Sequence, residues 1–367
     1  MNPSFDPPES NTAEISVLGT GGGYGECSII HLGNNSWVVV DSCIDPLTHS
    51  SLPLNYLKKM HVDVANDVKL IICTHWHDDH ILGISELLEN CKNAKLSLAK
   101  TTDRVKFLSF VSLDFQKLRS EATASSTFEI NRCFDILKSR QQDIISAVQD
   151  RLLISLDQGG NRNEIISLSP SDYIISEFDK EISTLITEFG DPNQKIVFQT
   201  PNTKSIVLFL KLGNHRAILG ADLEVTEDIR HGWLNIINSC QSIDKKASHF
   251  KVPHHGSENG YHSKIWIELL KENPLSTLTP WNRNNKLPTP DMLKQLITHT
   301  DRLFMTSKLL KDKPKDRKKE IEKIISRQKR NLREDRYHFG LIQSRIDFCD
   351  PNAEWEVALF GNAFHVN

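Results

Sequence analysis

The sequence predicts a mixed α/β fold, and two observations lead to this prediction. Short apolar runs such as Val68 to Cys73 and Arg216 to Leu219 end in turn-forming or polar residues, as buried strands do. Other segments, such as Ile81 to Asn90, follow the strands with helical character. With 367 residues, of which 38% are hydrophobic and 25% charged, the chain can bury one large core or two moderate ones.

The N-terminal part of the chain predicts three strands. Ile15 to Gly23 fits a strand followed by a glycine-rich turn. Cys27 to His31 and Trp37 to Asp41 fit two more strands, joined by the turn Gly33-Asn34-Asn35. Asp41 therefore stands at the end of a strand, where a turn carboxylate is common.

The segment that follows the strand Val68 to Cys73 carries three histidines and two aspartates within six residues. In an extended segment alternate side chains share a face, so His75, His77 and Asp79 project together. His80 follows as the chain turns into the helix. The loop can offer His75 and His77 to one cation, and Asp79 and His80 to a second. Histidines in a surface turn are the alternative, and the H-x-H-x-D-H spacing after a buried strand favours the metal site.

Two later blocks place further candidate ligands after strands. Ser205 to Leu210 and Arg216 to Leu219 predict a hairpin across Gly213-Asn214, which ends in Gly220-Ala221-Asp222. Asp222 is either a ligand or the N-cap of a helix over Glu224 to Ile237. The second block, Val252 to Ser257, contains the pair His254 and His255. These histidines either take part in the metal site or only satisfy local hydrogen bonds.

Together these blocks resemble the signature of the metallo-β-lactamase fold superfamily of metal-dependent hydrolases. The resemblance covers most of the chain and implies a single four-layer αββα domain over residues 1–367, with the metals at one edge of two facing sheets. It implies that Asp41 braces the histidine loop and that Asp222 bridges two metals. It implies a ligand role for His255, directly before a glycine, and a supporting or substrate-contacting role for His254. The implied metal ligands are His75, His77, Asp79, His80, Asp222 and His255.

One departure from the superfamily pattern concerns the segment Thr200 to Ser205. Many members with two metals place a further histidine here, and this sequence has none. The metal held by His75 and His77 is therefore expected to be weaker, or to be completed by Asp222, water and Asn202. This version of the pattern resembles one branch of the superfamily. The branch includes the hydrolase domain of bacterial DNA-uptake channel proteins and stand-alone hydrolases, some of which are found among phage-defence genes.

The resemblance implies two divalent metal ions, zinc first and manganese as the alternative. Paired cations would activate a water and bind the oxygens of a phosphodiester, so we expect a phosphodiesterase or nuclease. Asp79 would orient the nucleophile, and His254 would contact phosphate or protonate the leaving alkoxide. The expected partners are nucleic acid and, if the protein is the effector of an antiphage system, other subunits of a defence complex.

Three alternatives stay open at the sequence level. A small-molecule hydrolase acting on a lactone, thioester or cyclic nucleotide would use the same metals. A non-catalytic, metal-binding regulatory subunit would bind metal tightly without turnover. A metal-dependent redox enzyme is least favoured, because no flavin- or haem-binding signal accompanies the site.

Two segments do not belong to a minimal hydrolase. Residues 101–160 predict a helical insertion beside the site, which is either a substrate element or an extra packing layer. Residues 308–336 predict a basic helical segment with a net charge of +7, while the rest of the chain carries −10. It would attract phosphate backbones. Its interleaved acidic residues also fit a solvated, ion-paired helix.

The sequence also suggests where the protein resides. Its seven cysteines are scattered and never spaced as C-x-x-C, which favours reduced thiols. The N-terminus has no pattern of a signal peptide, and no run approaches the length of a membrane span. We therefore expect a cytoplasmic protein without a membrane partner.

Overall fold

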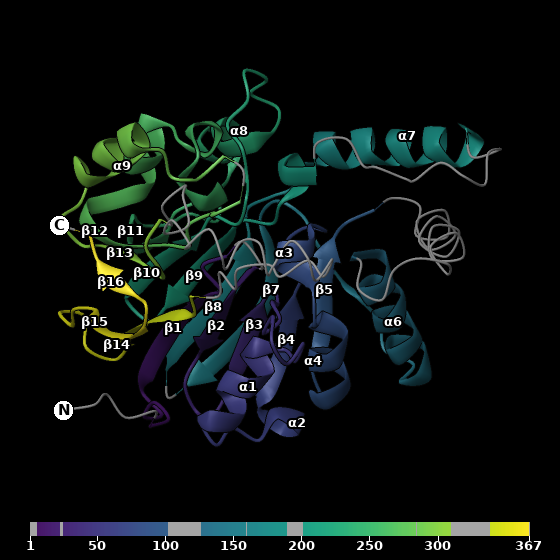
Figure 1. Ribbon diagram of the computed structural model, residues 1–367, viewed down its shortest axis with the longest axis horizontal. Coiled ribbons are helices and arrows are strands. Elements are labelled where there is room, and N and C mark those ends of the chain that lie inside the picture. The colour runs from purple at the N-terminus through teal and green to yellow at the C-terminus, as the bar shows by residue number, and fades with distance from the viewer. Residues whose placement is uncertain are drawn as a thin grey trace, which may run out of the picture.

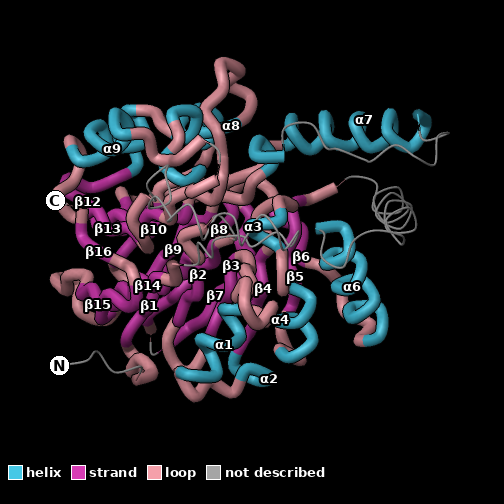
Figure 2. The backbone as a smooth tube through the Cα atoms, viewed as in Figure 1, coloured by secondary structure: helices cyan, strands magenta, loops and turns pink. Residues whose placement is uncertain are grey.

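The computed structural model describes residues 6–22, 25–101, 126–158, 160–188, 201–283, 285–309 and 338–366. In these residues two eight-stranded sheets face each other, and helices cover their outer faces (Figure 1). Figure 2 shows the same arrangement, with the strands in the middle and most helices above and below them.

The first sheet has the strand order β15-β14-β1-β2-β3-β4-β5-β6. Strands β3 to β6 are parallel, and the remaining pairs are antiparallel. Parallel neighbours need crossover connections, and here these carry the helices of the outer face. The strands are β1 (Thr12–Gly19), β2 (Glu26–His31), β3 (Trp37–Val40), β4 (Val68–Ile72), β5 (Lys95–Ala99), β6 (Ile145–Ala147), β14 (Gly340–Asp347) and β15 (Glu356–Gly361).

The second sheet has the order β16-β13-β12-β11-β10-β9-β8-β7. Strands β10 to β13 are parallel, and the flanking pairs are antiparallel. Each sheet thus contains a parallel block next to an antiparallel one. The strands are β7 (Arg151–Gln158), β8 (Asn161–Ser167), β9 (Leu208–Leu212), β10 (His215–Leu219), β11 (Ala247–Lys251), β12 (Leu270–Leu278), β13 (Leu303–Met305) and β16 (Phe364–His365).

The helices differ in length and position. Helix α7 extends outward from the two sheets, whereas α1, α4 and α6 lie against the first sheet (Figure 1). The helices are α1 (Leu52–Lys59), α2 (Val64–Asp67), α3 (Asp78–Ile81), α4 (Ile84–Asn90), α6 (Ser126–Ser139), α7 (Asp172–Glu188), α8 (Gly232–Ser239) and α9 (Pro290–Ile297). Short turns are η1 (Pro201–Lys204), η2 (His254–Gly256), η3 (Glu258–Gly260) and the π-helical η4 (Ile265–Leu269). None of the helices in the described ranges has the length and apolar character that crossing a membrane requires.

Alternation along the strands builds three apolar layers. In β3, Val39 faces the cluster under α1, α4 and α6, whereas Val38 and Val40 face the cluster between the sheets. In β10, Ile218 faces the cluster under α8, and Leu219 faces the interior. This period of two is what a sheet covered on both faces requires. The predicted four-layer αββα architecture is therefore confirmed.

The predicted helical insertion over residues 101–160 is only partly helical. Residues 102–125 lie outside the described ones, and residues 126–139 form α6. The following apolar residues, which fit helical spacing in the sequence, instead form β6 and β7 at the edges of the two sheets. Open sheet edges offer β5 and β8 as pairing partners, and local spacing cannot reveal such partners. The predicted basic helical segment over residues 308–336 falls almost entirely outside the described residues.

The predicted helix over Glu224 to Ile237 is wrong at its start, because α8 begins only at Gly232. The Thr226 hydroxyl donates to the carbonyl of Asp228, and the Asp228 carboxylate accepts from the backbone of Arg230. Such side-chain bonds to the backbone compete with a helix and form turns instead. Asp222 consequently caps no helix.

Candidate metal centre

The candidate ligands all follow strands of the parallel blocks. Asp41 follows β3, the histidine segment follows β4, Asp222 follows β10, and His254 and His255 follow β11. The carboxyl ends of parallel strands meet at one edge of a sheet, where ligand sites of α/β folds commonly form. Because the two sheets face each other, this edge brings residues of both halves together.

Two groups of candidate ligands result, and both contain Asp222. One group is Asp79, His80, Asp222 and His255, and the other is His75, His77 and Asp222. Within each group, the ligand atoms lie within 4.8 Å of one another. The Nε2 atom of His80 lies 3.5 Å from Asp79 Oδ2 and 3.5 Å from Asp222 Oδ1. The Nε2 atom of His75 lies 3.7 Å from the other oxygen of Asp222, so this carboxylate stands between the two groups.

Unpartnered polar atoms show that these residues fit metal ions. The Nε2 atoms of His75 and His80 and the Oδ1 atom of Asp222 are buried and have no hydrogen-bond partner among the described residues. Buried polar atoms are nearly always hydrogen-bonded. Imidazole nitrogen and carboxylate oxygen are ligands for zinc, manganese and iron. The donor set and its unpartnered atoms therefore fit two neighbouring divalent cations.

Hydrogen bonds behind the ligands orient the imidazole rings. The Nδ1 atom of His80 lies 2.8 Å from Asp41 Oδ2, and the Thr74 hydroxyl donates to the same oxygen at 2.7 Å. Thr74 Oγ1 is also 3.0 Å from His75 Nδ1, and His255 Nδ1 is 2.9 Å from the carbonyl of Thr279. Because the Nδ1 atoms are occupied, the Nε2 atoms face the ligand groups, as in other histidine metal sites.

Burial and charge set the ionisation of the ligands. Burial, reinforced by the nearby His80, holds the pKa of His75 well below its ordinary value, which keeps this imidazole neutral and ready to bind a metal. Burial alone would also lower the pKa of His255, but the carboxylates of Asp222 and Asp79 raise it to about 9. The same carboxylates raise the pKa of His80 well above its usual range against the effect of burial. Protons and metal ions thus compete for these nitrogens.

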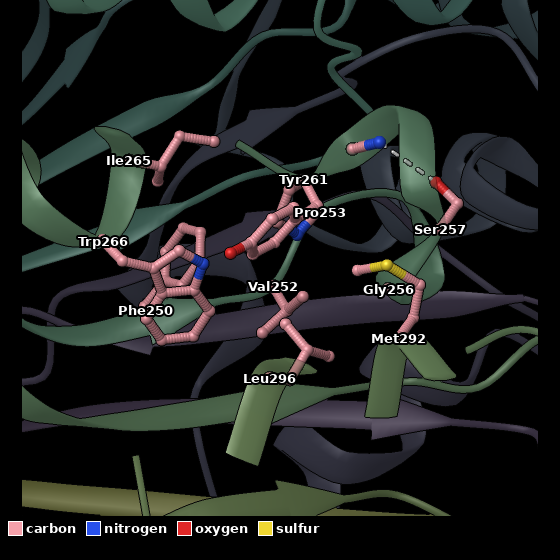
Figure 3. A pocket seen from close by; sticks show the side chains of 11 residues that line it. Phe250, Val252, Pro253, Gly256, Ser257, Tyr261, Ile265, Trp266, Met292 and Leu296 are labelled. Carbon is pink, nitrogen blue, oxygen red and sulfur yellow. Dashed lines mark hydrogen bonds between the residues drawn. The ribbon is translucent and has the colours of Figure 1, made fainter. Parts of the chain in front are cut away.

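The loop that carries His255 is held from behind by apolar packing. Figure 3 shows a small pocket behind it, lined by Val252, Pro253 and Gly256 and by apolar side chains of the outer layer, among them Trp266 and Met292. Gly256 has a φ of 72°, and a Cβ atom there would come within 3.1 Å of Pro288. Glycine after His255 therefore meets a steric requirement as well as the conformational one.

His254 lies beside the ligand groups. Its Nε2 atom is 3.1 Å from Asn202 Nδ2, and its Nδ1 atom is 3.5 Å from Glu224 Oε1. Asn202, expected to complete the site of His75, uses its amide nitrogen for contacts with His254 and Glu224. A polar groove continues from His254 along Ser257, Glu258, Asn259, Asn285, Lys286, Leu287 and Thr289.

Sequence reasoning missed an aromatic and basic loop at the site. The ring of Trp281 lies 5.4 Å from that of His255, and the guanidinium of Arg283 lies 5.5 Å from the Trp281 ring. The stretch from Trp281 to Lys286 thus brings an aromatic ring and the basic residues Arg283 and Lys286 together in one loop. Its position beside a ligand becomes visible only in the fold.

A second missed feature is an ion pair beneath the ligands. The ammonium of Lys251 lies 2.5 Å from Glu26 Oε1, and both side chains are buried. Burial would raise the pKa of Glu26, but Lys251 and the nearby histidines lower it overall. A glutamate at the start of one strand and a lysine at the end of another give no signal in the sequence.

Comparison with known proteins points to one family. Residues 20–106, which include the histidine segment, match the family model described as the metallo-beta-lactamase superfamily. No curated protein matches the sequence.

Several solved structures resemble the chain at low identity. The metallo-beta-lactamase fold protein YhfI from Bacillus subtilis is 13% identical with a TM-score of 0.30, covering 65% of this chain and 70% of that one. Zn(2+)-bound PqqB from Methylobacterium extorquens is 13% identical with a TM-score of 0.33, covering 65% and 71%. A metallo-beta-lactamase from Pontibacter korlensis is 12% identical with a TM-score of 0.25, covering 56% and 62%. The similarity to the metallo-beta-lactamase superfamily therefore lies in residues 20–106, the part of the chain that carries Asp41 and the histidine segment.

Proposed function

We propose that the protein is a metal-dependent phosphodiesterase that acts on nucleic acid. The observation that carries this proposal is the pair of ligand groups that share Asp222. Divalent cations bound there would polarise a phosphodiester and lower the pKa of a water, which is the chemistry of two-metal hydrolases. Zinc is our first candidate and manganese the second.

Residues of the chain would divide the remaining work. Asp79 Oδ2 lies 3.3 Å from His255 Nε2 and can orient the attacking water while it binds metal. His254 stands outside both ligand groups with its ring held by Asn202 and Glu224. From there it can contact a phosphate oxygen or protonate the leaving alkoxide.

The groove next to His254 supports a polymeric, anionic substrate. Lys286 lines this groove and would add positive charge for phosphates, and the neighbouring loop carries Trp281 and Arg283, an aromatic and a basic side chain of the kind that bind single strands. The basic segment over residues 308–336 would add to this charge. By resemblance to the branch noted above, we extend the proposal to an effector of an antiphage system that acts in the cytoplasm with other subunits.

The test combines metal content with cleavage. The purified chain should contain two divalent ions and should cleave single- or double-stranded DNA, RNA or bis(p-nitrophenyl) phosphate. Asp79→Ala and His255→Ala should abolish cleavage and lower metal content. His254→Gln should reduce turnover while metal content stays at the wild-type level, and equal loss of both would contradict its role.

Salt separates the proposed substrate from a small one. Binding of nucleic acid should weaken steeply as salt rises, because phosphate contacts release counterions. Two bound metals with no cleavage of any phosphodiester would argue against the proposal and favour a small-molecule hydrolase or a regulatory subunit.

A further inference from the structure

The buried ion pair of Glu26 and Lys251 joins the two sheets directly beneath the ligand groups. Glu26 begins β2 in the first sheet, and Lys251 ends β11 in the second. Their side chains are 2% and 5% exposed. A buried ion pair is seldom more stabilising than apolar side chains of the same volume, because both charges lose their hydration. Stability alone therefore gives a weak reason for this pair.

The position of Glu26 gives a stronger reason for the presence of this ion pair. Glu26 Oε1 lies 3.9 Å from His80 Nε2, the atom that faces Asp79 and Asp222. The other oxygen, Oε2, is buried and has no hydrogen-bond partner in the part of the chain that the structure describes. Lys251 holds the carboxylate through Oε1 only. The unpartnered oxygen thus belongs to a buried carboxylate whose other oxygen lies 3.9 Å from a candidate metal ligand.

The pair also fits the charge of the centre. Two divalent cations would face two aspartates as charged ligands, so a further carboxylate nearby favours the cations and a lone ammonium opposes them. With Glu26 and Lys251 both present, the pair is neutral as a whole, and the Glu26 carboxylate lies 3.9 Å from His80 Nε2. The two residues therefore have opposite expected effects on metal affinity, which a purely structural pair would not have.

We propose that Glu26, held by Lys251, is a positioning residue of the metal centre that orients and electrostatically supports the group of Asp79, His80, Asp222 and His255. The inference rests on the proposed metal-dependent function only in requiring that the chain binds metal. It does not depend on the substrate.

Cobalt(II) is the probe, because its visible absorption reports the ligand arrangement independently of activity. Metal-free chain is titrated with cobalt(II), and affinity and spectrum are compared among variants. Glu26→Gln should weaken binding by about tenfold or more and shift the spectrum, because it leaves a buried ammonium beside the cations. Lys251→Met removes the ammonium and should strengthen binding, and the double variant should recover part of the affinity that Glu26→Gln loses.

Glu14→Gln is the matched control. Glu14 is also a buried glutamate of the first sheet, and it accepts from Arg345 Nε at 2.8 Å within a separate network. This variant should cost stability and leave the cobalt titration unchanged. The thermal unfolding of every variant is recorded, so that a loss of folding is not read as a loss of affinity.

Three outcomes decide whether Glu26 is a positioning residue of the metal centre. Wild-type cobalt affinity and spectrum in Glu26→Gln would overturn the inference. Should that variant fail to fold, the double variant decides by comparison with Lys251→Met, from which it differs only at Glu26: a lower affinity in the double variant supports the inference, and an equal affinity overturns it. A chain that binds cobalt, responds to Glu26→Gln and cleaves no phosphodiester would contradict the proposed function and support this inference.

Discussion

Asp41 supports the histidine segment through three hydrogen bonds. Its carboxylate accepts from the backbone and hydroxyl of Thr74 and lies 2.8 Å from His80 Nδ1. Its φ of 63° is tolerated by Asn as well as Asp, so Asp41→Asn removes the charge with little backbone strain. We expect this variant to lose about 10- to 100-fold in metal affinity, measured by titration of the metal-free chain.

Thr74→Val is the control for Asp41. It removes a hydroxyl that contacts both the Asp41 carboxylate and His75 Nδ1, but it keeps the charge of Asp41 and its contact with His80. Its effect on metal affinity should be clearly smaller. Equal losses in the two variants would mean that the local packing, and not the carboxylate, governs affinity.

His249 predicts a dependence of stability on pH. Both ring nitrogens are buried without a hydrogen-bond partner among the described residues, and the ring lies 4.9 Å from that of Trp355. Burial, with a smaller effect from Arg302, lowers its pKa to about 3. Between pH 6.5 and 3 the unfolded chain therefore binds a proton that the native state refuses. Stability falls as the pH falls through this window, by about 2 kcal/mol from pH 7 to pH 5.

The measurement is urea unfolding at pH 7 and pH 5 in a metal chelator. His249→Phe keeps an aromatic ring against Trp355 and removes the titrating group. The difference in free energy of unfolding between the two pH values should shrink by about 2 kcal/mol in this variant. An unchanged difference would show that His249 is accessible to protons in the native state.

At the scale of elements, a network under α1 ties two strands of the first sheet together. The Tyr56 hydroxyl donates to Glu14 at 2.6 Å, contacts Ser16 and accepts from Gln343. Tyr56→Phe leaves these buried groups with fewer partners, so we expect a loss of about 1–3 kcal/mol in the free energy of unfolding. Chemical denaturation measures it. Tyr173→Phe, which removes a hydroxyl bonded at the surface to Arg230, should cost little.

The elements that the sequence predicts well are those with strong local signals. The strand before His75 and the hairpin before Asp222 combine apolar runs with turn residues, and their ends carry most of the candidate ligands. Strands β6 and β7 were predicted as helix, because pairing at a sheet edge depends on distant residues. The late start of α8 reflects turn bonds that local propensity does not count.

At the scale of the whole molecule, contacts between segments that are distant in the sequence cannot be predicted from local sequence patterns. Glu26 and Lys251 are separated by 225 positions, and neither belongs to a motif. Trp281 is likewise near His255 only because the loop after β12 folds back over the ligand loop. Packing of the two sheets, which local pattern does not specify, creates both arrangements.

The ligand groups draw on both sheets, and this predicts that metal stabilises the whole fold. The first sheet supplies His75 and His80 and the second supplies Asp222 and His255, so a bound ion links the two halves of the sandwich. A metal that binds only the native state should add about 2.7 kcal/mol at a concentration of 100 Kd. Calorimetry should therefore show Tm rising with added zinc and falling with a chelator.

Two variants separate the contributions of the two groups. Asp222→Asn changes the residue shared by both, so the metal-dependent rise in Tm should disappear almost entirely. His77→Gln affects one group only, and one equivalent of metal with part of the rise in Tm should remain. A Tm that zinc and chelator leave unchanged in the wild-type chain would mean that the sheets are held together without metal. The centre would then contribute to chemistry or binding and not to the closure of the fold.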